Sequence, residues 1–205
     1  MATGKGWTAA AVRVGAHALC WIPALLWLNR IRLGQLGADP VAELTHASGD
    51  WALRFLLLCL AMTPLRRVTG HTGPIRYRRM LGLYAFAYAS AHFAVYLVLD
   101  LGGYWPQIFE DLRKRPYIMV GFAAWLGMLP LALTSTRAAM RALGRRWGQL
   151  HRLVYVCGVC AVVHFWWLVK ADLREPLLYA GILLILLGAR LVSRWTSGRK
   201  ASHAG

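Results

Sequence analysis

The sequence predicts an all-α fold, a polytopic membrane helix bundle of six transmembrane helices that forms one domain over residues 1–205. Three observations predict it. Of the 205 residues, 58% are hydrophobic and only 16% are charged, which is far more apolar than an ordinary soluble domain. The apolar residues form runs close to the ~20 residues that a helix needs to cross a bilayer. The basic residues lie in short groups between these runs, as in cytoplasmic loops.

Each predicted helix is an apolar run bounded by charge, Pro or Gly, near residues 11–29, 50–66, 80–101, 117–135, 150–169 and 176–194. The first run follows Lys5 and Arg13. Because no small-residue cleavage motif precedes Asn29, we expect this run to be retained as a span, and we expect Pro23 to kink it.

Prolines mark the ends of the later helices. The second and fourth runs end near Pro64 and Pro130, and the fourth and sixth begin at Pro116 and Pro176, where a missing backbone N–H costs least. The third and fifth runs follow clusters of arginine.

Charge predicts the orientation. If both termini lie on one side, that side carries sixteen of the 24 Lys and Arg residues, and the other side carries the remaining eight together with all eight acids. Under the positive-inside rule both termini are cytoplasmic (N-in/C-in), and loops 30–49, 102–116 and 170–175 face outward. We therefore expect a multi-pass protein of a bacterial inner membrane, with the lipid bilayer as its surroundings.

Two other classes of site are disfavoured. The net charge of +16 could suggest nucleic acid, but basic groups spaced by membrane-length runs indicate topology instead, so we expect no nucleic-acid partner. The four cysteines lie inside apolar segments, where neither a disulfide framework nor a zinc site is expected. The pair Cys157 and Cys160 lies mid-helix, away from the helix N-terminus that would lower a thiol pKa, so both are interpreted as small apolar filler.

Histidines inside the spans are the strongest candidates for chemistry, because ionisable side chains in hydrocarbon are costly and usually functional. His17, His92 and His164 lie within spans, and His151 lies at the inner mouth of the fifth. Helix rise places His92 about 18 Å above Met80 and His164 about 21 Å above Leu150. Because the third and fifth helices both run outward, these two imidazoles could hold one haem iron from opposite faces.

The alternative is that each is an ordinary core histidine bonded to a neighbouring carbonyl or hydroxyl group. Their matched depth favours haem. We expect an aromatic shell around the iron, supplied by Phe86, Tyr88, Phe93, Phe165 and Trp166.

A second haem near His151 stays open. His151 precedes His164 by 13 residues, or about 20 Å, which suits a haem near the cytoplasmic face, but the intervening rotation of about 220° does not return to the same helix face. Arg78, not histidine, stands 14 residues before His92. An inner haem would need His71, His17 or another group, and otherwise His151 is an interfacial side chain. The basic residues that could pair with haem propionates, or serve topology and anionic lipid, are Arg78, Arg79, Arg145, Arg146 and Arg152.

Several short motifs occur in a fixed order over nearly the whole chain: Leu36–Pro40, Thr63-Pro64-Leu65, Ala91-His92, Arg115-Pro116-Tyr117, and Leu143–Tyr155 followed by His164. Each motif is weak alone. Together they resemble the MsrQ (YedZ) family of the ferric-reductase-like transmembrane superfamily, which is related to the membrane domains of NADPH oxidases and metalloreductases. The resemblance implies a single domain of this kind over residues 1–205.

The resemblance also implies a function. Such a subunit carries haem b in a system that repairs methionine sulfoxide in envelope proteins. Electrons from the quinone pool, or from a cytosolic flavin reductase, would pass through haem b and FMN to a periplasmic molybdenum-containing methionine sulfoxide reductase. By motif, His92, His151 and His164 match the family's haem-associated histidines, with His92 and His164 as axial ligands. Where NADPH oxidases have a second histidine on the third helix, this chain has Arg78.

The residues themselves limit the mechanism. No G-x-G-x-x-G turn joins a strand to a helix, so we expect the electron donor to be another molecule. The outward loops are too short to fold a catalytic domain, so we expect catalysis on a partner subunit. Two alternatives remain, a ferric-reductase-like electron carrier with another acceptor and a haemless transporter or assembly factor.

Overall fold

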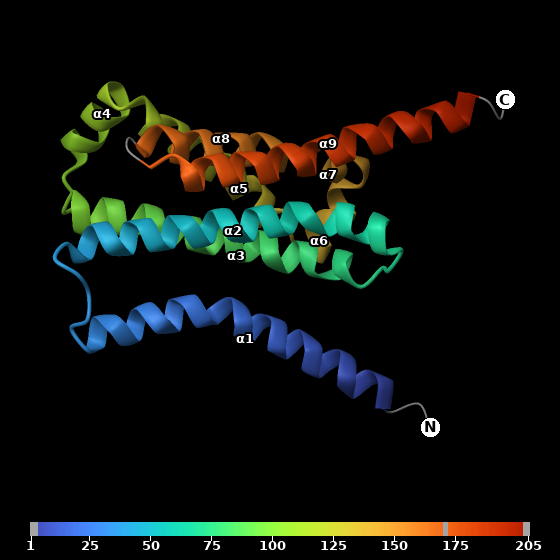
Figure 1. Cartoon of the computed structure of the whole chain (residues 1–205), viewed down its shortest axis with the longest axis horizontal. Helices are drawn as coiled ribbons and strands as arrows, with labels where there is room; N and C mark the ends of the chain where they lie inside the picture. The colour runs from blue at the N-terminus through green and yellow to red at the C-terminus, as the bar shows by residue number, and fades with distance from the viewer. Residues whose placement is uncertain (1–3, 170–171, 203–205) are drawn as a thin grey trace.

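The computed structural model describes the backbone of residues 4–169 and 172–202, and the regular structure in these ranges is entirely helical. The prediction of an all-α chain is confirmed. The long helices are α1 (Gly4–Arg32), α2 (Pro40–Thr69), α3 (Arg78–Val95), α5 (Pro116–Leu133), α8 (Leu153–Leu168) and α9 (Arg174–Ser202). Figure 1 shows them as a bundle with α2 and α3 side by side near its centre. Each predicted helix corresponds to one of these six.

Shorter helices connect them. They are the 3₁₀-helix η1 (Pro74–Tyr77), the π-helix η2 (Tyr96–Asp100), α4 (Trp105–Lys114), α6 (Arg137–Leu143) and α7 (Arg145–Leu150). The sequence had not predicted α4, α6 or α7. α4 lies within residues 102–116, which were expected to be an outward-facing loop.

Five helical segments in the described part of the chain are long and apolar enough to cross a membrane: Ala10–Arg32, Pro74–Asp100, Pro116–Leu133, Arg145–Leu168 and Arg174–Val192. The chain is therefore a multi-pass membrane protein. The second predicted span, which corresponds to α2, is not among them. Its apolar stretch carries Asp50 and Arg54, which lie 3.6 Å apart as an ion pair.

α2 begins ten residues earlier than predicted, so the loop expected over residues 30–49 is confirmed only for residues 33–39 and is wrong for residues 40–49. Asp39 caps the helix, with its Oδ1 accepting from the backbone N of Ala42 at 2.9 Å, and Pro40 stands in the first turn, where its missing N–H costs little. Glu43 accepts from the backbone N of Gly37 at 2.8 Å. This early start makes residues 40–49 part of a helix that packs beside α3.

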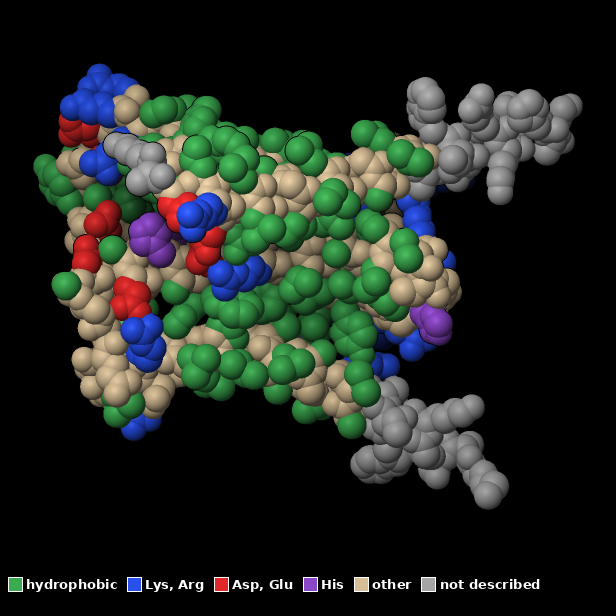
Figure 2. Space-filling model, viewed as in Figure 1, with side chains coloured by type: hydrophobic (Ala, Val, Ile, Leu, Met, Phe, Trp, Pro, Cys, Tyr) green, Lys and Arg blue, Asp and Glu red, His purple; other side chains and the backbone are tan. Residues whose placement is uncertain are grey.

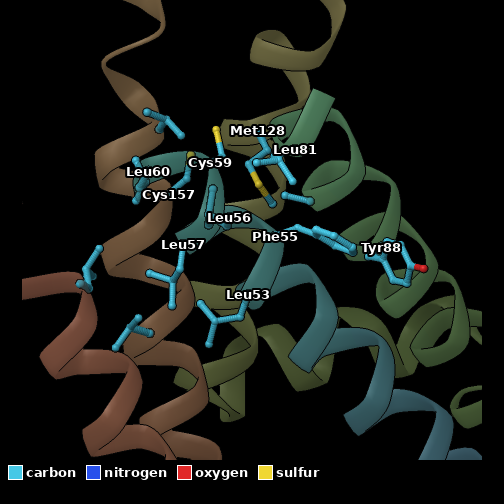
Figure 3. Close-up of a cluster of buried hydrophobic side chains, with 14 of the residues drawn as sticks. Leu53, Phe55, Leu56, Leu57, Cys59, Leu60, Leu81, Tyr88, Met128 and Cys157 are labelled. Atoms are coloured by element: carbon cyan, nitrogen blue, oxygen red, sulfur yellow. The ribbon is translucent and has the colours of Figure 1, made fainter. Parts of the chain in front are cut away.

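The core lies around the middle of α2. Leu60 and Leu56 are 0% and 2% exposed. Figure 3 shows these leucines meeting Leu81 of α3, Met128 of α5 and Cys157 of α8. Many apolar side chains on the outer faces of the helices are exposed, which fits a bundle surrounded by lipid.

A tyrosine of α3 is hydrogen-bonded to the backbone of α1. Pro23 lies inside α1, and the helix bends part-way along its length (Figure 1), as predicted. Tyr88 of α3 donates its hydroxyl to the carbonyl of Cys20 at 2.8 Å and accepts from the backbone N of Ala24 at 3.2 Å. In a regular helix this carbonyl and this N–H would bond to each other. The hydroxyl is therefore inserted into the hydrogen-bond ladder of α1, a recognised cause of helix bending.

The two ends of the bundle differ. One end of the bundle holds the end of α1, the start of α2, α4, the end of α8 and the start of α9 (Figure 1). We call it the acidic end, because the acidic side chains in view gather toward it (Figure 2). The opposite end, which we call the basic end, holds the start of α1, α6, α7 and the end of α9. Both described ends of the chain therefore lie on one side.

Candidate functional site

A cavity opens between α2, α3, α5 and α8, nearer the acidic end. Its volume is about 260 Å³, near the lower end of the ~300–1,000 Å³ of common small-molecule sites. Its walls are mostly apolar, from Leu53 and Leu56 to Phe165 and Leu168. His92 and His164 line it, and we call it the histidine cavity.

The structure brings His92 and His164 together. Their ring centroids are 6.2 Å apart, and the ring planes are inclined at 76°. His92 Nδ1 lies 2.9 Å from the carbonyl oxygen of Thr45 on α2. His164 Nδ1 lies 2.7 Å from the carbonyl oxygen of Tyr117 on α5. Each ring is thus held by a helix other than its own.

These contacts determine the tautomer of both rings. A carbonyl oxygen can only accept, so Nδ1 of each histidine must carry the proton and donate. In a neutral imidazole the other nitrogen, Nε2, then has a free lone pair and can bind a metal. His92 and His164 are therefore both prepared as metal ligands.

The separation of the rings fits one shared metal ion. A nitrogen–metal bond of about 2 Å, with about 1.1 Å from that nitrogen to its ring centre, gives about 6 Å between the centres of two rings on opposite sides of one metal. Among the described residues no group of three or more His, Cys, Asp or Glu side chains could hold a metal ion. Two imidazoles without further protein ligands suit haem, because the porphyrin supplies the remaining four nitrogens.

The aromatic shell differs from the prediction. Phe93 and Phe165 line the histidine cavity, as expected. Tyr88 instead bonds to α1, Phe86 stacks on Trp125 at 6.2 Å outside the cavity wall, and Trp166 is 37% exposed. None of these three residues lines the cavity, so these three expectations are wrong. The aromatic lining residues that the sequence did not predict are Tyr96, Tyr117, Phe122 and Trp125.

Polar side chains surround the mouth of the cavity. His46, Asp50, Asp100 and Arg115 line it in addition to the two histidines. Arg115 Nε lies 3.4 Å from Asp111, whose side chain is only 4% exposed. The mouth is therefore charged, whereas the interior is apolar apart from the imidazoles.

A second pocket lies toward the basic end, and we call it the inner pocket. Its volume is about 250 Å³, and it is lined by Arg78, Arg79, Trp147 and His151 among others. Leu56 and Met128 line both this pocket and the histidine cavity. A wall of apolar side chains therefore separates the two spaces.

His151 lies in the inner pocket and not beside His164. Its Nε2 is 3.1 Å from Thr134 Oγ1, and Thr134 donates its one hydroxyl proton to the carbonyl of Pro130 at 2.6 Å. Nε2 of His151 must therefore donate, which leaves Nδ1 as the nitrogen with a free lone pair. The ring also stacks on Trp147, with centroids 4.0 Å apart. This is the opposite tautomer to that of the two cavity histidines.

The other candidate residues lie elsewhere. His17 bonds to Tyr84 at 3.0 Å, and His71 lies in the turn after α2, with Nδ1 2.8 Å from the carbonyl of Thr69. Neither lines the inner pocket. Of the five arginines considered for propionates, Arg78 and Arg79 line it, and the structure does not place Arg145, Arg146 or Arg152 in its wall. Cys157 and Cys160 are free thiols on α8.

Comparison with known proteins gives consistent matches. The family model described as ferric reductase like transmembrane component matches residues 48–162, a range that contains His92 and His151 and ends two residues before His164. The protein-methionine-sulfoxide reductase heme-binding subunit MsrQ of Xanthomonas euvesicatoria pv. vesicatoria (strain 85-10) is 63% identical over 171 residues, which cover 82% of this chain and 78% of the relative.

A more distant relative covers almost the whole chain. The subunit of the same name from Ralstonia nicotianae (strain ATCC BAA-1114 / GMI1000) is 44% identical over 198 residues, or 95% of this chain and 91% of the relative. No solved structure matches significantly. The resemblance inferred from the sequence motifs is confirmed, and the chain belongs to the MsrQ family of ferric-reductase-like transmembrane proteins.

Proposed function

We propose that this protein is the haem-binding membrane subunit of a methionine sulfoxide reductase system and that it conducts electrons across a bacterial inner membrane. The observation that carries the proposal is the pair His92 and His164, with ring centroids 6.2 Å apart in one apolar cavity. The relatives are named heme-binding subunits, which supports it.

His92 and His164 would hold one haem iron through their Nε2 atoms. The haem is of the b type in this proposal, because Cys160 is followed by Ala161 and not by the histidine of a C-x-x-C-H attachment motif. When bound, haem supplies one-electron chemistry. The chain supplies two fixed imidazoles and an apolar wall, which excludes water and lowers the dielectric constant around the iron.

The inner pocket is where we propose that electrons enter. Arg78 and Arg79 make it basic, and Trp147 and His151 add two stacked rings. Such a lining suits an anionic or ring-bearing redox group, which includes FMN and a quinone. The donor is the quinone pool or a cytosolic flavin reductase.

A second haem on His151 would need a different arrangement from the first. His151 could offer Nδ1 only, and the lining of the inner pocket contains no other histidine among the described residues. We therefore propose one bis-imidazole haem, and a second haem on His151 stays a prediction.

We further propose six membrane spans with both termini in the cytoplasm. α2 is 30 residues long, or about 45 Å, which exceeds the ~30 Å hydrocarbon thickness. It lies at the centre of the bundle (Figure 1), and its two opposite charges, Asp50 and Arg54, pair with each other. The acidic end would then face the periplasm.

Electrons would leave at the mouth of the histidine cavity, which lies toward the acidic end. We propose that the acceptor is a periplasmic molybdenum-containing methionine sulfoxide reductase subunit docked there, and that catalysis takes place on that partner. His46, Asp50, Asp100 and Arg115 line this exit.

Two measurements test the proposal. The protein, expressed with sufficient haem and purified, is expected to show a Soret band and the spectrum of low-spin bis-imidazole haem, and its absence would sink the haem assignment. Dithionite-reduced protein is then mixed with the periplasmic reductase or with a ferric chelate. Reoxidation by the reductase is expected. Reoxidation by the ferric chelate but not by the periplasmic reductase would favour a ferric reductase instead. The description of the matched family, ferric reductase like transmembrane component, keeps this alternative in view.

A further inference from the structure

We propose that Gly49 and Gly121 are positioning residues for the two cavity histidines. Each lies where a histidine ring from a neighbouring helix rests against the backbone, and each leaves room for that ring to reach a carbonyl oxygen. This inference rests on the proposed function, because it concerns how the haem ligands are held.

The contact at Gly121 is the tighter one. A Cβ atom at this position would lie 2.7 Å from Nδ1 and 2.8 Å from Cε1 of His164, closer than real Cβ contacts. The contact at Gly49 is of the same kind, with a Cβ atom 3.1 Å from Nδ1 and 3.2 Å from Cε1 of His92. Alanine at 121 would have to displace the ring, and alanine at 49 would require a shift of a few tenths of an ångström.

The two contacts have the same register. His92 bonds to the carbonyl of Thr45, four residues before Gly49. His164 bonds to the carbonyl of Tyr117, four residues before Gly121. In an α-helix the carbonyl of residue i points along the axis toward residue i+4 and accepts its N–H. Its second lone pair is free for another donor.

A donor that uses this second lone pair must pass close to the side chain of residue i+4. With glycine at i+4 there is no side chain, so an imidazole can lie flat against the helix and donate Nδ1–H to the carbonyl. We call this arrangement a carbonyl–glycine cradle. The described part of the chain contains it twice, on α2 for the ligand from α3 and on α5 for the ligand from α8.

Other helical glycines give a contrast. Glycine in a helix interior is destabilising relative to alanine. At Gly181 and Gly188 a Cβ atom would meet nothing within 4 Å, and at Gly127 it would meet Cys157 Sγ at 2.8 Å. Gly127 is thus as tightly packed as Gly121, but against a thiol instead of a histidine.

Loss of a cradle has a defined effect. Displacing the ring breaks the Nδ1–H bond to the carbonyl and turns Nε2 away from its position. That hydrogen bond raises the basicity of the ligand nitrogen, which stabilises the ferric iron. Without it, haem affinity falls and the midpoint potential of the haem that remains rises.

The test compares Gly49→Ala and Gly121→Ala with Gly181→Ala, which fills open space, and Gly127→Ala, which overpacks without touching a histidine. Haem affinity, the low-spin signal of the ferric protein and its midpoint potential are measured on purified full-length protein. For Gly121→Ala we expect about 10–100-fold weaker haem binding and a higher potential, with a smaller change for Gly49→Ala. Gly181→Ala and Gly127→Ala should keep the affinity and potential of the wild type.

The outcomes separate the two proposals. If the wild type itself lacks bis-imidazole haem, the proposed function fails. If the wild type has it and Gly121→Ala keeps its affinity and potential, or Gly127→Ala changes them equally, the cradle is wrong. Should Gly121→Ala not accumulate, Gly49→Ala decides, since its methyl group demands only a small shift. Wild-type haem binding and potential in that variant would then overturn the inference.

Discussion

His92 and His151 differ in which ring nitrogen is free, and this difference follows from a single acceptor in each case. The Thr45 carbonyl accepts a hydrogen bond from Nδ1–H of His92. The Thr134 hydroxyl already donates to Pro130, so it accepts a hydrogen bond from Nε2–H of His151. A local hydrogen bond thus prepares one histidine to bind iron through Nε2 and engages the same atom of the other.

The separation of His151 from the histidine cavity can be tested by mutation. We expect His151→Ala to reduce the haem-to-protein ratio less than His92→Ala or His164→Ala does, and to keep the bis-imidazole signal, because Leu56 and Met128 lie between the two pockets. Quantitative haem analysis of the purified variants checks this. A loss as large as that in His164→Ala would show that the pockets are not independent.

At the scale of elements, α1 is joined to the bundle through few side chains. Tyr88, which is 5% exposed, satisfies both the carbonyl of Cys20 and the N–H of Ala24. Tyr84, one turn earlier on α3, contacts side chains of α1, with its hydroxyl 3.0 Å from His17 Nδ1 and its ring against Trp21. Tyr88 therefore contacts the backbone of α1, whereas Tyr84 contacts side chains of α1.

Tyr88→Phe should loosen α1. Loss of a partner for a buried backbone group costs about 1–3 kcal/mol. A loss of 1–2 kcal/mol would raise the fraction of molecules in which α1 is detached from α3 by about 5–30-fold. Cys20, whose carbonyl accepts from Tyr88, is only 4% exposed. In a variant with the other three cysteines replaced, the rate at which a maleimide labels Cys20 in detergent therefore reports the detachment of α1. Tyr84→Phe is the matched control, and equal labelling in the two variants would contradict the insertion of Tyr88 into the α1 ladder.

One buried carboxylate of α4 holds this helix to η2, which directly follows α3. Tyr96 of η2 donates to Asp111 Oδ2 at 2.8 Å, and Gln107 donates to Oδ1 at 3.0 Å. Glu110, on the next position of the same helix, pairs with Lys114 at the surface, and this hydrogen bond lowers the pKa of Glu110. Adjacent acids on α4 thus have different environments.

Asp111→Ala is expected to destabilise the protein. Loss of the hydrogen bonds to this buried carboxylate should cost about 2–3 kcal/mol and lower the midpoint of thermal unfolding by roughly 4–12 °C. Glu110→Ala removes only an exposed pair and should leave the midpoint unchanged. Differential scanning fluorimetry in one detergent compares them, and an equal effect of the two substitutions would argue against the role of Asp111.

At the scale of the whole molecule, the two ends of the bundle define the proposed topology. Single cysteines at Tyr104, between η2 and α4, and at Gly73, before η1, lie at opposite ends. In a chain without its native cysteines, we expect a membrane-impermeant maleimide to label Tyr104→Cys in intact spheroplasts and Gly73→Cys only after lysis. The reverse pattern would invert the proposed orientation.

The sequence predicted the features that depend on one helix at a time. Helix rise alone placed His92 and His164 at similar depths, and the structure brings them together. The early start of α2 was readable in Asp39, Pro40 and Glu43, which are typical of a helix N-terminus, but the apolar run that defined the helix begins only ten residues later.

Features that depend on which helix faces meet were not predictable. Gly49 and Gly121 have no property that distinguishes them from Gly181 until a neighbouring helix places a histidine against them. Phe122 and Trp125 likewise enter the cavity wall because α5 packs against α3 and α8. Tyr88 was expected beside the haem, and only the position of α1 reveals its actual partners.

The shared iron is tested most directly by electron paramagnetic resonance and near-infrared magnetic circular dichroism of the ferric protein. The account predicts the signals of bis-imidazole low-spin haem in the wild type, and their loss in both His92→Ala and His164→Ala, because one imidazole cannot hold six-coordinate iron of this kind. Bis-imidazole signals that persist in either variant would contradict it.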